Sequence, residues 1–178
     1  VSTLGMQGSG KYYWECKLNS LGGSSDSERF GISNLNDLSN YPFGSSSGYS
    51  YNKDGNATPS GSGFPTYTTN DIIGVAFDAG NGNMWFSKNG TWINSATISE
   101  IAAGTTTNSA FSGIGSAGEY FFPAMSGYDG NKVEFNFGNG YFSTTAITSA
   151  GSNASNIGSF EYDVPNNFTA LCTKGLNE

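Results

Sequence analysis

The chain has 178 residues, with 7 Lys and Arg against 14 Asp and Glu, and no His. Gly, Ser, Asn and Thr make up 87 residues, aromatic residues 15% and charged residues 12%. The aromatic content excludes a disordered chain, the acidic balance without a basic patch argues against nucleic-acid binding, and the lack of His excludes a His-based triad or a His-ligated zinc. No apolar run approaches the roughly 18 residues of a membrane span, so no membrane insertion is expected.

The first half of the chain predicts three short strands separated by turns. They cover 11–18, 28–33 and 48–53. Bulky and polar residues alternate in these segments, and residues such as Gly, Asn and Asp lie in the turns between them. In the first strand we expect one face to be core, with Cys16 on it as a buried, reduced thiol. This face carries Tyr12, Trp14, Cys16 and Leu18, and the opposite face carries Lys11, Tyr13, Glu15 and Lys17.

The clearest unit is a hairpin over 71–92, which turns at 80–83 and turns again at Asn89-Gly90. A faint helical pattern follows at 98–103, then strands at 120–126 and 132–137 and apolar segments at 160–162 and 168–171. Long Gly, Ser, Thr and Asn loops are predicted at 34–47, 57–69, 95–118 and 138–159. This pattern predicts an all-β fold of two antiparallel sheets packed as a sandwich.

Five segments in this order resemble the SPRY family. They are Gly10-Lys11-Tyr12-Tyr13-Trp14-Glu15, Arg29-Phe30-Gly31-Ile32, Gly48-Tyr49-Ser50-Tyr51 with Asp54-Gly55, 71–78 with 85–90, and Phe121-Phe122-Pro123-Ala124 with 133–138. The resemblance implies a bent β-sandwich of the concanavalin or jelly-roll type with long loops. It also implies a binding scaffold without catalytic machinery, which recognises a protein, a peptide or a glycan through its loops.

The ends of the chain suggest a part of a larger protein. Only nine residues precede the first of these segments, so upstream strands of the family are expected to be missing, and 1–160 is predicted to form the sandwich. The closing segment 161–178 resembles the end of SPRY-like domains in virion proteins of tailed bacteriophages, and it is expected to lead to a following module. The polar, Lys-poor composition is similar to that of exposed phage appendage proteins.

Aromatic residues in loops are the candidate ligand contacts, because a loop aromatic has no sandwich face to fill and Tyr is favoured at binding surfaces. The family resemblance implies aromatic contacts in the loops that hold Tyr41 and Tyr128. The alternative is a small cluster that covers one end of the sandwich. The candidate residues are Tyr41, Phe43, Tyr67 and Tyr128.

No catalytic, metal or cofactor site is predicted. The carboxylates are scattered over different strands and turns, and solvated strand faces explain them better than a catalytic pair. The Gly-Asn-Asp turns suit hairpins rather than calcium loops, and no glycine lies in a phosphate-binding motif. Two cysteines are too few for a disulfide framework, and whether Cys16 and Cys172 pair stays open. The carboxylates considered are Glu15, Glu28, Asp78, Glu119, Asp129 and Glu134.

Three functional hypotheses follow. The first is a non-enzymatic module on the exposed surface of a phage virion, which mediates adhesion to a host-surface protein or glycan, or assembly with other virion proteins. A homo-oligomer is among the forms considered, since phage appendages are commonly symmetric. The second is a cytoplasmic SPRY adaptor that recognises a short peptide. The third is a carboxylate-dependent glycan hydrolase.

Overall fold

The computed structural model describes residues 4–8, 10–22, 28–35, 43, 48–115, 119–127 and 130–177. In this part of the chain two mainly antiparallel sheets pack face to face, and the prediction of an all-β sandwich is confirmed. The larger sheet has the order β12-β1-β5-β6-β7, and β9 pairs with the second half of β1. Its strands are β1 (Lys11–Ser20), β5 (Ile72–Asp78), β6 (Asn83–Lys88), β7 (Thr91–Trp92), β9 (Lys132–Asn136) and β12 (Thr169–Ala170).

The smaller sheet has the order β4-β3-β2-β8. The remaining elements among the described residues are short: a two-stranded hairpin, the helix α2 and two 3-10 turns. The four strands are β2 (Arg29–Asn34), β3 (Gly48–Asn52), β4 (Ala57–Thr58) and β8 (Phe121–Ser126). The short elements are β10 (Tyr141–Phe142), β11 (Thr145–Ala146), α2 (Ile98–Ala103), η1 (Ile93–Ser95) and η2 (Gly175–Asn177).

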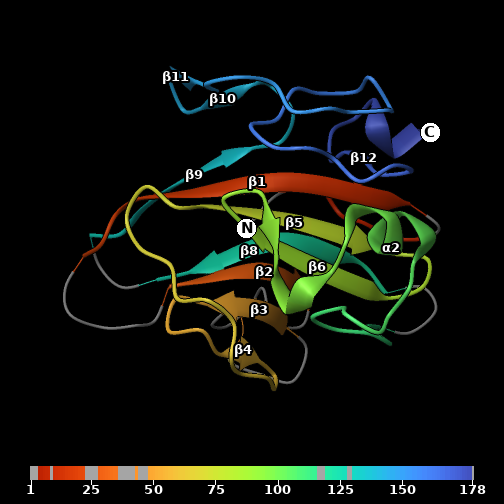
Figure 1. Ribbon diagram of the computed structural model, residues 1–178, viewed down its shortest axis with the longest axis horizontal. Coiled ribbons are helices and arrows are strands. Elements are labelled where there is room, and N and C mark those ends of the chain that lie inside the picture. The colour runs from red at the N-terminus through yellow and green to blue at the C-terminus, as the bar shows by residue number, and fades with distance from the viewer. Residues whose placement is uncertain are drawn as a thin grey trace.

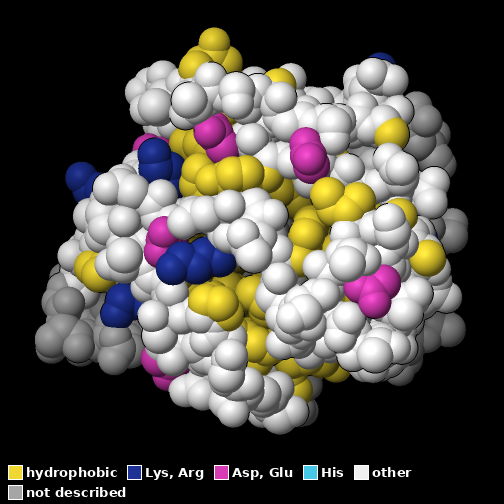
Figure 2. All heavy atoms as spheres, viewed as in Figure 1, with side chains coloured by type: hydrophobic (Ala, Val, Ile, Leu, Met, Phe, Trp, Pro, Cys, Tyr) yellow, Lys and Arg dark blue, Asp and Glu magenta, His cyan; other side chains and the backbone are white. Residues whose placement is uncertain are grey.

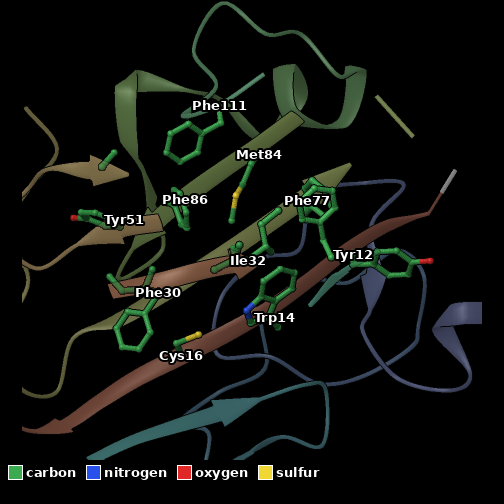
Figure 3. Close-up of a cluster of buried hydrophobic side chains, with 14 of the residues drawn as sticks. Tyr12, Trp14, Cys16, Phe30, Ile32, Tyr51, Phe77, Met84, Phe86 and Phe111 are labelled. Atoms are coloured by element: carbon green, nitrogen blue, oxygen red, sulfur yellow. The ribbon is translucent and has the colours of Figure 1, made fainter. Parts of the chain in front are cut away.

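The sandwich core lies between the two sheets and is mostly aromatic (Figure 3). Alternate side chains of β1 enter it, as the sequence predicts, and Trp14 and Cys16 are fully buried. Tyr51 from the smaller sheet lies 5.6 Å from Phe86 of the larger one, measured between ring centroids. Such inclined aromatic pairs add specific contacts to the area that they bury.

The other face of the larger sheet is also covered, which the sequence did not predict. The chain after β9 lies along this face, while the smaller sheet lies on the opposite side of β1 and β5 (Figure 1). A second apolar cluster forms there, in which the Tyr13 and Phe160 rings meet edge to face at 4.9 Å. Gly138 and Gly158 have positive φ and approach so closely that a Cβ on Gly158 would lie 2.8 Å from the Gly138 Cα. The segments around Gly138 and Gly158 can therefore lie side by side while they cover the sheet.

Three of the predicted long loops contain regular structure, and the loop at 57–69 begins with β4. The helical pattern at 98–103 forms α2, whose first turn is fixed by a capping box: Thr97 Oγ1 accepts from the Glu100 N–H, and the Glu100 carboxylate accepts from the Thr97 N–H. Gly104, at φ +75°, ends the helix in the left-handed conformation. The loop at 138–159 contains the hairpin β10-β11. None of the helices in the described part of the chain is long and apolar enough to cross a membrane.

Candidate functional site

Two of the four predicted contact residues lie in the interior. Tyr67 is only 2% exposed, its ring stacks on Phe30 with centroids 5.5 Å apart, and its hydroxyl donates to the Glu28 carbonyl at 2.8 Å. Burial raises the pKa of Tyr67 well above its ordinary value. Phe43 is 3% exposed, with φ of 68°. The alternative interpretation, a packed cluster, fits both side chains, because a partner cannot reach them without opening the core.

Tyr41 and Tyr128 lie outside the described residues, so their contact role stays a prediction. The strand register nevertheless places the anchors of their two loops. Arg29 pairs with Ser126 and Asn34 pairs with Phe121, so the loop after β2 and the loop after β8 leave the smaller sheet at opposite ends.

An exposed apolar pair marks the end of the smaller sheet at which β2 finishes and β8 begins. Leu35 directly follows β2 and is 58% exposed, and Tyr120 directly precedes β8 and is 44% exposed. The cross-strand pair of Asn34 and Phe121 brings the two residues to the same edge. Among the described residues only two other large apolar side chains are exposed, Leu21 at 36% and Tyr141 at 47%. We call Asn34, Leu35, Glu119 and Tyr120 the Leu35–Tyr120 surface.

Fixed backbone supports this surface. The Asn34 side-chain amide donates to the Glu119 carboxylate, which ties the end of β2 to the approach to β8. Met6 exchanges two backbone hydrogen bonds with Phe121, at 2.7 and 3.0 Å. A Cβ on Gly5 would lie 3.2 Å from the Tyr120 ring, so glycine lets the N-terminal segment pass beside that ring. The surface therefore combines two apolar side chains with one carboxylate at one end of the smaller sheet.

The carboxylate of Glu15 has a structural role, and the expectation that it lies on a solvated strand face is wrong. Glu15 is fully buried beside the second cluster. Its carboxylate accepts from the backbone N–H groups of Glu161 and Tyr162, both at 2.9 Å, from the Asn136 amide at 3.2 Å and from the Tyr13 hydroxyl at 3.2 Å. Burial raises the pKa of Glu15, although these hydrogen bonds act in the opposite direction. Glu15 thus fastens the C-terminal chain to β1.

The other buried carboxylates are also engaged in the fold, contrary to the solvated faces expected. Asp78 accepts from the N–H groups of the turn at 80–81 and lies 3.3 Å from Lys11 Nζ. Glu28 is fully buried and accepts from the Asn131 amide. Glu15, Glu28 and Asp78 share no hydrogen-bond partner within the described chain, so their bonds do not join two of them as a catalytic pair. Figure 2 shows few charged side chains on this face, with apolar side chains exposed down its middle.

Neither cysteine is bonded to a disulfide partner, and the described residues contain no group of three or more potential metal ligands. Cys16 is buried, as predicted for a reduced thiol of the core. Burial raises its pKa well above the ordinary value. Cys172 is only partly buried.

Sequence reasoning missed Leu35 and Tyr120 for different reasons. Leu35 fell within a predicted polar loop, and Tyr120 was assigned to a predicted strand. An isolated Leu among Ser and Asn residues was the available indication, because no strand face near it required an apolar side chain.

Comparison with known proteins gives consistent results for family and fold. A family model described as "SPRY domain" matches residues 11–140. The solved SPRY domain of human HERC1 has a similar structure, with a TM-score of 0.57 and 20% identity, over 75% of this chain and 78% of that one. No curated protein matches the sequence.

Proposed function

The chain belongs to the SPRY domain family, and on this premise we propose that it is a non-catalytic module of a bacteriophage virion protein that binds a protein partner through the Leu35–Tyr120 surface. SPRY domains are generally non-catalytic modules for protein–protein interaction. The choice of surface rests on two of the four exposed large apolar residues in the described chain, which lie together at one end of the smaller sheet. Tyrosine is enriched among the residues that dominate the binding energy of protein interfaces.

Three features support the rest of the proposal. Gly, Ser, Asn and Thr make up 87 of 178 residues, and charged residues only 12%, a composition similar to that of exposed phage appendages. The closing segment 161–178 resembles the end of SPRY-like domains in virion proteins. The buried carboxylates hold the fold together, which supports binding rather than hydrolysis. We place the domain at the virion surface, where it mediates adhesion or assembly.

The virion proposal is tested on phage particles produced from the genome that encodes the chain. Mass spectrometry of purified particles should detect peptides of this chain, and cross-linking within the particle should identify its neighbour. Absence from the particles, together with a host cytoplasmic partner in the infected cell, would instead favour the adaptor hypothesis.

The surface is tested by binding of the complete chain to that neighbour. The double substitution Leu35→Ser and Tyr120→Ser should weaken binding at least about tenfold, because interface anchors typically contribute more than about 1 kcal/mol each. The matched control is Leu21→Ser with Tyr141→Ser, which removes the same residue types from exposed positions elsewhere. If both double variants weaken binding equally, or if neither weakens it, the partner binds elsewhere.

A further inference from the structure

A pocket of about 760 Å³ lies where β1 begins and β12 runs beside it. It is separate from the Leu35–Tyr120 surface and shares no residue with it. Three parts of the chain line it: the approach to β1, the turn at Ala154 and Ser155, and the residues on either side of β12. This volume lies in the range of roughly 300–1,000 Å³ that is typical of small-molecule sites. We call it the β12 pocket.

Several polar groups in the β12 pocket have hydrogen-bonding capacity to spare. Within the described chain, no hydrogen bond uses the side-chain amide of Gln7, the side-chain amide of Asn166 or the hydroxyl of Tyr12. Asn167 uses only its amide nitrogen, which donates to the Ala102 carbonyl at 3.4 Å, and its amide oxygen is free. Figure 3 shows the Tyr12 hydroxyl pointing away from the other core side chains. Amides and hydroxyls offer donors and acceptors together.

The one cation in the pocket lining is already neutralised. Lys11 Nζ lies 3.3 Å from the Asp78 carboxylate, donates to the Ala102 carbonyl at 3.5 Å, and sits 5.6 Å above the centre of the Phe168 ring. An anionic ligand would have to compete with Asp78 for this ammonium group. The free polar groups of the pocket are therefore uncharged, while Ala154 and Leu176 add apolar lining.

We propose that the β12 pocket binds a neutral saccharide unit. Each hydroxyl of a sugar is both a donor and an acceptor, so it can pair with the amides of Gln7 and Asn166 and with the Tyr12 hydroxyl. The C–H face of the sugar ring can lie against the apolar part of the lining. An uncharged sugar leaves the contact between Lys11 and Asp78 intact, whereas an acidic sugar would disturb it. The site does not depend on the proposed function, because the protein partner contacts a different surface.

The test is a titration of the complete, isotope-labelled chain followed by nuclear magnetic resonance. The probes are D-glucose, D-galactose and N-acetyl-D-glucosamine, each up to about 50 mM, because a monosaccharide held by a few hydrogen bonds is expected to have a millimolar Kd. At least one probe should give saturable shifts of the backbone amides of Gln7, Asn166, Asn167 and Thr169. D-Glucuronate, which carries a carboxylate, should bind at least about tenfold more weakly than the neutral probe.

Two variants locate the site. Ala154→Trp places a bulky ring at an exposed position of the pocket lining and should abolish the saturable shifts. Asn166→Ala removes an exposed amide and should weaken binding at least about threefold. The control Ala146→Trp makes the same change at an exposed position of β11 and should leave binding unchanged. No saturable shift with any neutral probe, shifts that survive Ala154→Trp, or equal binding of D-glucuronate would each overturn the proposal.

Discussion

The two faces of β1 are buried in different ways. One face contributes Trp14 and Cys16 to the core between the sheets, where ring packing and apolar contacts dominate. The other contributes Tyr13 and Glu15, which meet the C-terminal chain rather than a second sheet. There, a buried carboxylate accepts hydrogen bonds from a segment that has almost no strand of its own.

This difference shows two ways to attach backbone to a sheet. The smaller sheet satisfies its own backbone through strand pairing, so apolar burial is sufficient to hold it in place. An irregular segment leaves N–H groups unpaired, and burying them without partners costs free energy. Glu15 supplies those partners for Glu161 and Tyr162. We therefore expect the C-terminal chain to open more readily than the sandwich, and the following changes test this expectation.

The largest effect should come from Trp14→Ala, which empties a fully buried site between the sheets. The free energy of unfolding should fall by about 3–5 kcal/mol, the usual range for truncating a buried aromatic residue. The comparison is Phe168→Ala, on the other side of the larger sheet, where the Phe168 ring meets Trp85 edge to face at 6.3 Å. Phe168→Ala should speed amide hydrogen exchange in 157–171 while β5 and β6 stay protected. Equal acceleration throughout would show that the two faces unfold as one unit.

A smaller effect is expected from Glu15→Gln, which keeps one acceptor oxygen but turns an amide nitrogen toward donors of the C-terminal chain. The free energy of unfolding, measured with urea at pH 4, should fall by about 1–3 kcal/mol, the usual cost of leaving buried hydrogen-bond donors without an acceptor. The matched control is Glu134→Gln on β9, where the side chain is only partly buried. A loss no larger than that of the control would contradict the fastening role of Glu15.

The difference in stability between the wild type and Glu15→Gln should depend on pH. Because burial raises the pKa of Glu15 above its ordinary value of 4.5, the folded protein holds this proton more tightly than the unfolded chain. The stabilising contribution of Glu15 is then fully present below about pH 4.5 and is lost as the pH rises through the folded-state pKa. Urea unfolding at several pH values from 4 to 7 should show the advantage of the wild type over Glu15→Gln shrinking as the pH rises. A growing advantage would mean that the folded-state pKa is lowered.

The smallest effect should come from Thr169→Val in β12. The Thr169 hydroxyl oxygen is buried and has no hydrogen-bond partner within the described chain. Replacing it with a methyl group of similar shape removes the cost of an unpaired polar atom, so the free energy of unfolding should stay equal or rise by up to about 1 kcal/mol. Thr145→Val, at an exposed position of β11, is the control. A clear loss of thermal stability only in Thr169→Val would reveal a hydrogen bond to this hydroxyl.

Local patterns predicted most of the strands and one face of the core. The hairpin of β5 and β6 follows from an apolar run, a Gly-Asn turn and a second run, all within about 20 neighbouring residues. Residues 168–171 stood out only as a short apolar segment, and nothing in them indicates that β12 pairs in parallel with β1. The burial of Glu15 was equally hidden, because its partners lie far along the chain at 161 and 162.

The candidate site was less predictable than the fold. Tyr67 was expected to be a surface contact because it lies in a loop, yet its hydroxyl reaches the carbonyls of Glu28 and Tyr51, which lets a loop residue join the core. Leu35 and Tyr120 come together only through the register of β2 and β8. The sequence alone does not show the register in which strands pair, so it does not show which exposed residues become neighbours.

The parallel pairing of β1 with β12 also has a consequence for biosynthesis. Tyr12 pairs with Thr169, so β1 needs a partner that is made much later in the chain. At the usual rate of translation, β1 leaves the ribosome roughly 8 to 30 s before β12 does. Over that interval the part of β1 that pairs with β12, at Tyr12 and Tyr13, stays open to chaperones or to a neighbouring nascent chain. Slow synthesis of the segments between them should therefore lower the yield of folded protein without changing the stability of the finished domain.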